Sequence, residues 1–401
     1  MKPFGDLVSR HEALKMIEKR ITTLKRVEEV ALIDAVGRVT ASDIVASFNV
    51  PPFNRASMDG YAVHGSDTMD TTSNNPRKLK LVGEIHAGET YVGSIKLGEC
   101  VEIATGSPIP DGADSVVMVE NTKVNNGWVD IFEAVDTGEN VAPEGEDIKK
   151  GDIVINSGDF ITPGKLGAIA ALGLDSIKVL DKPRIAVYST GTEIIPQGQK
   201  LKPGQIYDIN SFTLSAVIGR NGCESIKKRI VWDDYDTLKN EMTEVSNYDI
   251  AVFSGGSSVG SKDLLGSIIE ELGEVVFHGV RVKPGKPTLF GIIDCTPVFG
   301  MPGFPTSCLS NAYVFLTPAL RKIAGLPKEE PRTTKARLTR NVKGSPDREM
   351  FFTVRVEHDK ATPVYKQSGD ITSMAYANGF IVIPAGSNLE ADSEVETILL
   401  N

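Results

Sequence analysis

Apolar runs alternate with amphipathic stretches between residues 183 and 326, and this alternation restricts that region to an α/β architecture. Short apolar runs, typical of buried strands, occupy residues 185–188, 250–253, 275–282 and 288–293. Periodic stretches that predict helices follow at 211–219, 237–245, 264–272 and 306–323, with a kink at Pro318. Such alternation predicts a doubly wound parallel sheet with its ligand loops at the carboxyl ends of the strands.

The segment YDIAVFSGGSSVGSKD (248–263) leads from one of these strands into a loop of glycine and serine, and a helix is expected to begin near Asp263. Glycine lets the backbone approach a ligand closely, and successive amides with hydroxyls can hold an anion. A plain turn is the alternative. The candidate anion-binding residues of this loop are Ser254, Gly255, Gly256, Ser258 and Gly260.

Two further loops downstream favour anion binding over a plain turn. The first is KPGKP, in which prolines flank Lys283 and Lys286, and the second is MPGFPTS (301–307). An isolated lysine is usually only solvated, but two in one rigid loop can be held toward a ligand. Because several of these loops follow strands, we expect them to converge on one crevice.

The rest of the chain is richer in β-structure. Ser9 and Glu12 have capping-box spacing before a helix expected over 10–24, and residues 29–35 predict a strand. KLKLVGEI, ECVEIATG, DSVVMVEN and WVDIFEAV predict a small β-barrel or sandwich inserted over 48–139. Thr162 and Pro163 begin a packed helix that ends at Gly173. FFTVRVE, FIVIPAG and VETILL predict a second small β-domain after residue 327.

Composition excludes several function classes. The formal net charge of −10 disfavours nucleic acid and anionic membrane surfaces as partners, so an anionic substrate would need local lysines or a bridging cation. The four cysteines form no CxxC pair and the five histidines are dispersed, so no zinc site is expected. We found no stretch of transmembrane length and no signal-peptide core, and we therefore expect a cytoplasmic protein.

Loop carboxylates near the anion-binding loops indicate a divalent cation. Glu193, Asp208 and Asp263 would repel a bound phosphate unless a hard ion such as Mg²⁺ lay between them, and Asp59 is a further candidate. Such an ion could also stabilise a departing phosphate. Structural alternatives remain for each: Asp263 as a helix N-cap, Asp208 as a turn residue and Asp59 as part of an Asp-Gly turn.

Three familiar catalytic signatures fit poorly. Gly256–Gly260 matches the G-x-S-x-G nucleophile elbow around Ser258, but a polar interval separates it from the helix, and His278 and His358 are the only downstream bases. A serine hydrolase therefore stays a minor alternative. The KPGKP loop lacks the glycine spacing of a P-loop, and no G-x-G-x-x-G segment is present.

Taken together, the motifs resemble those of the molybdopterin molybdenumtransferase family, the molybdenum insertases that include the E domain of gephyrin. The resemblance rests on FNRASMDGYAV, ATGSPIPDGADSVVMVE, EGEDIKKGD, STGTEI, IYDINS, SGGSSVG, KPGKP and GMPGFPTS in this order, with QSGDITSMAYANGF as a looser match. It spans the chain from about residue 6 to the end. Each motif alone is weak, whereas their joint order is specific.

The resemblance implies four domains and a homodimer. The implied domains are an elongated one (1–47 and 140–181), an inserted β-barrel-like one (48–139), a molybdopterin-binding α/β one (182–326) and a C-terminal β-domain (327–401). The implied reaction inserts molybdate, or tungstate, into adenylylated molybdopterin and releases AMP, the last step of molybdenum cofactor biosynthesis, with Mg²⁺ required. A contact with the molybdopterin adenylyltransferase is also expected.

The resemblance further implies roles for individual residues. Ser254–Gly260 would bind the pterin phosphate or the nucleotide, Lys283 and Lys286 would neutralise anionic oxygens, and Glu193, Asp208 and Asp263 would place the metal or the nucleotide. Asp59, Thr105 and Asp147 would act across the subunit interface. Further substrate contacts are implied for Pro302, Gly303, Pro305, Ser307 and Ser368.

Two positions depart from the family pattern. Phe304 stands where many members have a polar residue, and Thr353 stands where an arginine would help to hold molybdate, a role that Arg355 could take over. Because gephyrin-like proteins also scaffold receptors, a binding module without catalysis is a second alternative. The presence of both lysines together with the loop carboxylates favours the enzyme.

Overall fold

The computed structural model describes residues 6–256 and 264–400, and the chain divides into two compact units. The first unit contains residues 1–29, 37–39 and 178–401, and the second contains residues 30–36 and 40–177. The chain passes from one unit to the other within β1 (Val27–Ala31) and β12 (Ser176–Leu180).

A six-stranded sheet forms the centre of the first unit, with the strand order β16-β13-β17-β21-β20-β18. The first four strands are parallel, and β20 and β18 are antiparallel to their neighbours. The strands are β13 (Arg184–Ser189), β16 (Glu224–Lys227), β17 (Ile250–Ser254), β18 (Gly273–His278), β20 (Leu289–Ile293) and β21 (Thr296–Met301). The apolar run at 250–253 is fully buried, as the pattern predicted.

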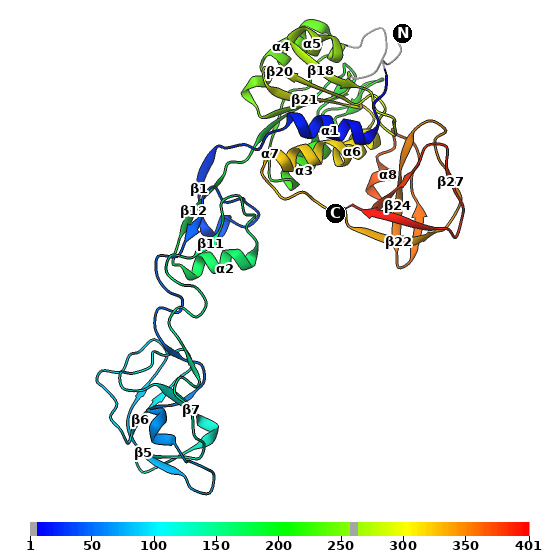
Figure 1. Ribbon diagram of the computed structural model, residues 1–401. Helices are drawn as coiled ribbons and strands as arrows, with labels where there is room; N and C mark the ends of the chain where they lie inside the picture. Colours follow the sequence, from blue (N-terminus) through cyan, green and yellow to red (C-terminus); the bar gives the residue numbers. More distant parts are fainter. Residues whose placement is uncertain (1–5, 257–263, 401) are drawn as a thin grey trace. The chain divides into compact units, whose positions relative to one another are not determined.

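Helices cover both faces of this sheet (Figure 1). On one face, α4 (Tyr235–Thr243) and α5 (Leu264–Leu272) pack against alternate strand residues such as Tyr188 and Phe253. The opposite face packs against α1 (Arg10–Arg20), α3 (Asn210–Arg220) and the helical segment that ends in α7 (Thr317–Ile323). The predicted capping box of α1 is present: Ser9 accepts from the Glu12 amide, and Glu12 accepts from the Ser9 amide. The layers therefore agree with a doubly wound fold.

Two details differ from the sequence prediction. The sheet is mixed because only two residues separate β20 from β21, too few for the crossover that parallel strands need. Asp294 and Cys295 instead turn the chain with φ of 46° and 67°. The expected single helix over 306–323 is interrupted: α6 (Pro305–Asn311) passes into a π-helical turn (Ala312–Leu316) before α7, with Pro318 in the first turn of α7.

The C-terminal residues of the first unit form a second six-stranded sheet with its own apolar core. Its strands are β19 (Val282–Lys283), β22 (Thr333–Leu338), β24 (Glu349–Glu357), β25 (Lys360–Pro363), β26 (Gly379–Ile383) and β28 (Glu394–Leu399). A short helix α8 (Thr372–Ala375) and the pair β23 (Val342–Lys343) and β27 (Asn388–Leu389) complete it. The pairing of β19 with β24 joins this sheet to the lysine loop that follows Val282.

The second unit contains the predicted inserted β-structure, a sheet with the strand order β7-β4-β6-β5-β9-β8. Its strands are β4 (Gly60–Val63), β5 (Arg77–Ile85), β6 (Glu99–Ile103), β7 (Ser115–Met118), β8 (Thr122–Asn125) and β9 (Trp128–Ile131). The pairs β2 (Ile44–Val45) with β11 (Ile153–Ile155) and β3 (Arg55–Ala56) with β10 (Val141–Ala142) adjoin it along the chain, as does α2 (Pro163–Ala171). Among the described helices, none has the length and apolar character that a membrane span requires.

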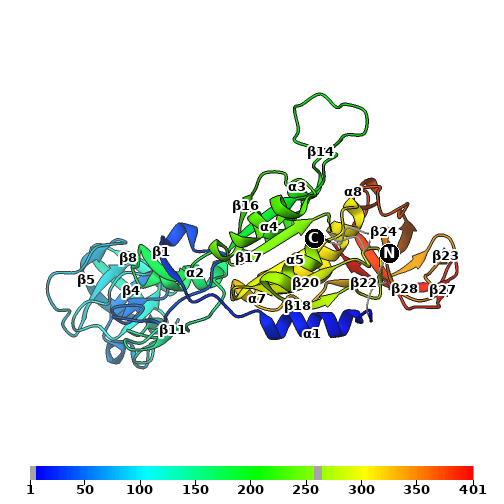
Figure 2. The ribbon, with the colours of Figure 1, turned by 90° about the horizontal axis from the view of Figure 1, so that it is seen from above.

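Four short 3-10 turns and one projecting loop complete the described elements. The 3-10 turns are η1 (Leu32–Asp34), η2 (Gly65–Thr68), η3 (Val119–Asn121) and η4 (Val245–Asn247). The loop between β13 and α3 extends away from the sheet and carries the two-residue strands β14 (Ile194–Ile195) and β15 (Ile206–Tyr207) (Figure 2).

Candidate functional site

Three neighbouring parallel strands end at the same edge of the α/β sheet. Ser189 of β13 is in register with Ser254 of β17, which in turn is in register with Met301 of β21. The loops that follow are joined by backbone hydrogen bonds, from the Thr190 amide to the Ser254 carbonyl (2.9 Å) and from the Gly255 amide to the Met301 carbonyl (3.1 Å). In the first unit the predicted loops therefore meet at one edge.

The glycine positions of the central loop are required by the packing of its neighbours. Gly255 and Gly256 both have positive φ, 104° and 65°, and a Cβ on Gly255 would lie 2.5 Å from the Thr190 carbonyl oxygen. Gly303 packs close to Gly255, since a Cβ on Gly303 would lie 3.6 Å from the Gly255 Cα. Ser258, Gly260 and Asp263, also predicted for this site, lie outside the described residues.

Asp208 is buried beneath these loops, and protein donors engage both of its carboxylate oxygens. It accepts from the Ser189 hydroxyl (2.8 Å) and from the amide and hydroxyl of Ser211 (3.1 and 2.5 Å). The Lys227 ammonium lies 3.5 Å from the second oxygen. A carboxylate offers about four lone-pair positions, so these contacts saturate Asp208. Its geometry is that of a residue that fixes the start of α3, in agreement with the turn alternative.

Asn210 ties two of the strand-end loops together. Its Nδ2 donates to the Ser254 hydroxyl (2.7 Å) and to the Gly303 carbonyl (2.8 Å). Cys308 lies on the other side of Ser254, with its sulfur 3.7 Å from the Ser254 Oγ. Burial raises the pKa of Cys308 to about 12, so its thiol stays protonated at neutral pH and is not a nucleophile. This part of the site is a rigid polar frame.

The Pro-Gly-Phe-Pro loop after β21 packs against the C-terminal domain. The Thr306 amide donates to the Ser368 carbonyl (3.1 Å), and the Thr306 hydroxyl donates to the Asp370 carbonyl (2.8 Å). Ser368 is thereby held beside the start of α6, where Pro305 occupies the first turn and Ser307 is buried. Phe304, the departure from the family pattern, is 64% exposed. Pro302 is buried.

The lysine loop KPGKP is braced from α6. Asn311 is fully buried, and its Nδ2 donates to the Gly285 carbonyl (2.8 Å) and contacts the Thr288 hydroxyl. Gly285 has φ of 96°, and any Cβ there would collide with the Asn311 side chain. Lys283 and Lys286, on either side of this glycine, are both half-buried. Because Leu289 pairs with Gly300, the loop lies near the carboxyl end of β21.

Two further acidic residues lie beside this edge, the exposed Glu193 and the half-buried Asp233. Glu193 follows β13 and is exposed. Its carboxylate folds back over Gly191, where a Cβ would lie only 2.8 Å from the nearer carboxylate oxygen, so the glycine leaves room for it. Asp233 was not predicted. Its Oδ1 would lie 3.3 Å from a Cβ on Gly256, which places it against the central loop. Its position two residues before α4, in the loop after a parallel strand, is the signal that could have identified it.

Asp59, Thr105 and Asp147 belong to the second unit. The Asp59 carboxylate accepts from both the amide and the hydroxyl of Thr105, each at 2.7 Å. These two bonds, the backbone one first, lower the pKa of Asp59 and keep it ionised. Asp147 is exposed in the turn before β11. The sequence did not predict the contact between Asp59 and Thr105, and their proposed role across a subunit interface stays a prediction.

Comparison with known proteins identifies the family. Three family models match this chain. They are described as "MoeA N-terminal region (domain I and II)", which matches residues 8–173, "Probable molybdopterin binding domain", which matches 186–322, and "MoeA C-terminal region (domain IV)", which matches 335–400. The molybdopterin molybdenumtransferase of Bacillus subtilis is 32% identical over 390 residues, covering 93% of this chain and 90% of that protein. The chain belongs to the molybdopterin molybdenumtransferase family.

Other relatives agree with this assignment. The Haemophilus influenzae molybdopterin molybdenumtransferase is 34% identical, covering 82% of this chain and 81% of that protein. Two crystal structures from Pyrococcus horikoshii, each described as a molybdopterin biosynthesis MoeA protein, superpose with TM-scores of 0.86 and 0.84, at 39% and 30% identity. Each covers 98% of this chain, and the two solved chains are covered to 99% and 100%. The multidomain α/β-plus-β fold of the family is therefore confirmed.

The described residues only partly fit the divalent ion that this family resemblance implied. No group of three or more acidic, histidine or cysteine side chains suited to a metal ion occurs within residues 6–256 and 264–400. Asp208 does not fit as a ligand, because its oxygens are engaged by Ser189, Ser211 and Lys227. Glu193 does fit, since its carboxylate is exposed at the strand-end edge.

The second departure from the family pattern lies on β24. Thr353 is 1% exposed, and its hydroxyl has no hydrogen-bond partner in the described part of the chain. Arg355 is exposed and pairs with Glu357 at 2.7 Å, two residues along the same strand. Arg355 is thus engaged at the surface, and nothing in the structure supports it as a replacement for the expected arginine.

Proposed function

We propose that this chain inserts molybdenum from molybdate into adenylylated molybdopterin and releases AMP, the last step of molybdenum cofactor biosynthesis. The observation that carries the proposal is the braced lysine loop beside the glycine-rich strand ends. Lys283 and Lys286 place two positive charges on one short loop, which gives an anion a local partner on a chain whose formal net charge is −10. Fixed lysines beside backbone amides can bind a phosphate and an oxyanion together. The family assignment supplies the reaction class.

Each part of the site has a distinct task in this proposal. The strand-end loop with Ser254, Gly255 and Gly256 binds phosphate oxygens through backbone amides. Lys283 and Lys286 hold the oxyanion and neutralise charge as the phosphoanhydride breaks. Pro302, Gly303, Pro305, Ser307 and Ser368 form the wall against which the substrate lies. Asp208 and Asn210 act beneath these loops as positioning residues.

A Mg²⁺ ion is part of the proposal, with Glu193 as a ligand. Asp263, which follows the glycine-rich loop in sequence, is the second proposed ligand and lies outside the described residues. Glu193 and Asp263 would hold such an ion, and its charge would offset the negative charge that develops on the leaving AMP. The saturated carboxylate of Asp208 favours an indirect role for that residue.

The proposal also includes a homodimer in which Asp59, Thr105 and Asp147 of one chain act on the strand-end loops of the other. The family resemblance supports this arrangement. A mixture of inactive Asp59→Asn and Lys283→Ala proteins tests it, because each mixed dimer would contain one intact site. After subunit exchange we expect about a quarter of wild-type activity, from symmetric exchange in a two-fold dimer. A mixture as inactive as its components would remove the shared site from the proposal.

A turnover assay tests the reaction itself. The protein is supplied with adenylylated molybdopterin, Mg²⁺ and either molybdate or tungstate, and AMP release is followed together with reconstitution of an apo-molybdoenzyme. AMP release that depends on the oxyanion and yields active cofactor supports the proposal and ranks the two metals. Tight binding without turnover would favour a binding module. Failure to bind the substrate would overturn the proposal.

Co-purification with a molybdopterin adenylyltransferase tests the proposed contact between the two proteins separately.

A further inference from the structure

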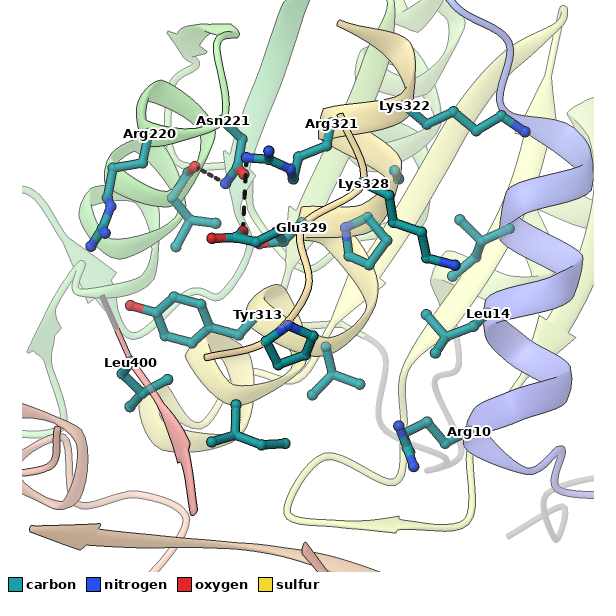
Figure 3. Close-up of a pocket in the computed structure, with 18 of the residues that line it drawn as sticks. Arg10, Leu14, Arg220, Asn221, Tyr313, Arg321, Lys322, Lys328, Glu329 and Leu400 are labelled. Carbon is teal, nitrogen blue, oxygen red and sulfur yellow. Dashed lines mark hydrogen bonds and ion pairs between the residues drawn. The ribbon is translucent and has the colours of Figure 1, made fainter. Parts of the chain in front are cut away.

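A cavity lies in the first unit, away from the strand-end loops. Its volume is about 620 Å³, and it lies between α1, the C-terminal end of α3, the length of α7, the connector after α7, and the C-terminal sheet (Figure 3). Arg220 and Asn221 of its wall stand at the end of α3, whereas Asn210 of the strand-end frame stands at its start. At 1.5 Å per residue, the helix separates the two places by roughly 15 Å.

The floor of this cavity is apolar. Ile17, Ile21 and Val217 line it and are almost completely buried, and Leu14 and Phe380 line it while remaining half-buried. The volume falls within the usual range for small-molecule sites, which are largely apolar with a few polar groups. A ligand for this floor therefore needs an apolar body.

The rim of the cavity is strongly cationic. Six lining residues are basic and two are acidic, Glu18 and Glu329, so the formal charge is 6 − 2 = +4 on a chain with a net charge of −10. One of the two carboxylates is already engaged, since Arg321 lies 3.8 Å from Glu329. The basic residues are Arg10, Arg220, Arg321, Lys322, Lys328 and Arg332.

Part of this charge has a structural explanation, and part does not. Arg220, Arg321 and Lys322 stand in the last turns of α3 and α7, where cations offset the helix dipole. Arg10 pairs with Glu349 at 2.7 Å. Lys328 and Arg332 lie instead on the irregular connector between α7 and β22. Both are exposed, and their side chains form no ion pair or hydrogen bond with any described residue.

The Tyr313 hydroxyl adds a donor for an anion. In Figure 3 the Tyr313 ring lies between Arg220 and Leu400, and within the described residues its hydroxyl forms no hydrogen bond. Burial raises the pKa of Tyr313, so this hydroxyl keeps its proton and can donate.

We propose that this cavity binds a small amphipathic anion, a molecule with an apolar body and a carboxylate or phosphate head. The body would lie on the floor around Val217 and Phe380, and the head would face Lys328 and Arg332. The proposal does not depend on the transferase reaction, because none of these residues belongs to the strand-end site. Failure of the turnover assay would leave it intact.

Calorimetric titration of the full-length protein with decanoate, decanol and decyltrimethylammonium tests the charge requirement with one common chain length. We expect decanoate to bind with one site per chain, decanol to bind more weakly and the cation to show no binding. Rising salt should weaken decanoate binding alone. Equal binding of all three probes would overturn the proposal, as would the absence of decanoate binding.

The double variant Lys328→Glu with Arg332→Glu locates the anion head. It should weaken decanoate binding about tenfold, because two attractive contacts become repulsive at an exposed rim. Lys343→Glu with Lys360→Glu makes the same charge change on exposed positions of the same domain, outside the cavity, and should leave the affinity unchanged. An equal loss in both double variants would reduce the effect to net charge and overturn the assignment.

The variant Leu14→Trp tests the apolar floor from α1. The larger ring would fill the space that the decanoate chain needs, so binding should be lost while the melting temperature stays within a few degrees of wild type. Leu97→Trp, at a 69% exposed position of the second unit, is the matched control.

Light scattering on the charge variants tests separately whether this face is a contact between copies of the chain. A change in oligomeric mass would assign this face to a contact between copies and overturn the proposal.

Discussion

The two groups of predicted acidic residues differ in how the protein holds them. Asp208 in the first unit is 2% exposed and has contacts to both oxygens from Ser189, Ser211 and Lys227. Asp59 in the second unit is exposed and is held by Thr105 alone through two hydrogen bonds. The first carboxylate is built into a frame that the fold requires. The second remains available to an external partner.

Because of this difference, removing the first carboxylate should mainly reduce the stability of the fold, and removing the second should mainly reduce activity. A buried carboxylate with several donors is costly to remove, because the donors are left without partners in a place that water does not reach. An exposed carboxylate held by one neighbour can be changed at little cost to the fold. Variants at Asp208 should therefore lower the free energy of unfolding, whereas variants at Asp59 should lower activity with little change in that free energy.

The largest expected effect is on stability, from Asp208→Ala. Loss of the carboxylate leaves the Ser189 and Ser211 hydroxyls and the Lys227 ammonium without their shared acceptor. We expect a loss of about 2–4 kcal/mol of unfolding free energy, measured by urea denaturation of the unit that contains the α/β sheet. Asp59→Ala is the comparison and should lower the urea midpoint far less, because its exposed carboxylate accepts only the two bonds from Thr105 among the described residues. Equal midpoints for both variants would contradict the frame role of Asp208.

A smaller loss of stability is expected for Asn311→Ala, which removes the brace of the lysine loop. The Gly285 carbonyl loses the Asn311 donor and keeps the Thr288 hydroxyl (2.9 Å), so we expect to lose the net value of one hydrogen bond, about 0.5–1.5 kcal/mol of unfolding free energy. The loosened loop should also raise the KM for molybdate, because Lys283 and Lys286 would no longer be held in place. Ser310→Ala, a buried neighbour on α6 that contacts Met374, is the control. An unchanged KM in the Asn311 variant would separate the brace from oxyanion binding.

Much of this framework could be predicted from sequence, whereas its buried polar contacts could not. The apolar run at 250–253 and the glycines after it have local causes, namely burial and positive φ, and both are encoded in adjacent residues. The antiparallel β20 depends on a two-residue turn at Asp294 and Cys295, for which neither residue type is a strong signal.

Asp208 and Asp233 illustrate the limit for site residues. A carboxylate in a loop after a strand can cap a helix, bind a metal or do neither, and the outcome depends on side chains that are distant in sequence. Asp208 is saturated by Ser189, 19 residues earlier, and by Lys227, 19 residues later. Asp233 lies against Gly256, 23 residues away. The position of Asp233 in a loop after a parallel strand could have marked it as a candidate, but local pattern does not say which distant residue either carboxylate contacts.

Glu193→Gln should affect function with almost no effect on stability. Its side chain is exposed and folds over Gly191, so removing the charge should change the unfolding free energy by less than about 0.5 kcal/mol. Turnover should fall, and the Mg²⁺ concentration needed for half-maximal rate should rise, if the carboxylate holds the ion. Glu224→Gln, at an exposed position on β16, is a charge-matched control. An unaltered Mg²⁺ dependence would remove Glu193 from the proposed ligand set.

The smallest effect concerns the titration of Asp59. Because hydrogen bonds to the ionised form lower its pKa, the bonds stabilise the fold above the ordinary pKa of an aspartate and are lost as the pH falls through the lowered value. Thr105→Val removes the hydroxyl donor and keeps the amide, the larger cause of the shift. The pKa should therefore rise part of the way toward its ordinary value, measured by carboxyl-carbon NMR titration. Thr105→Ser keeps both donors and should titrate like wild type. A valine variant with the wild-type titration would assign the whole shift to the backbone amide, and Thr105 would then contribute to Asp59 by its position in the chain and not by its side chain.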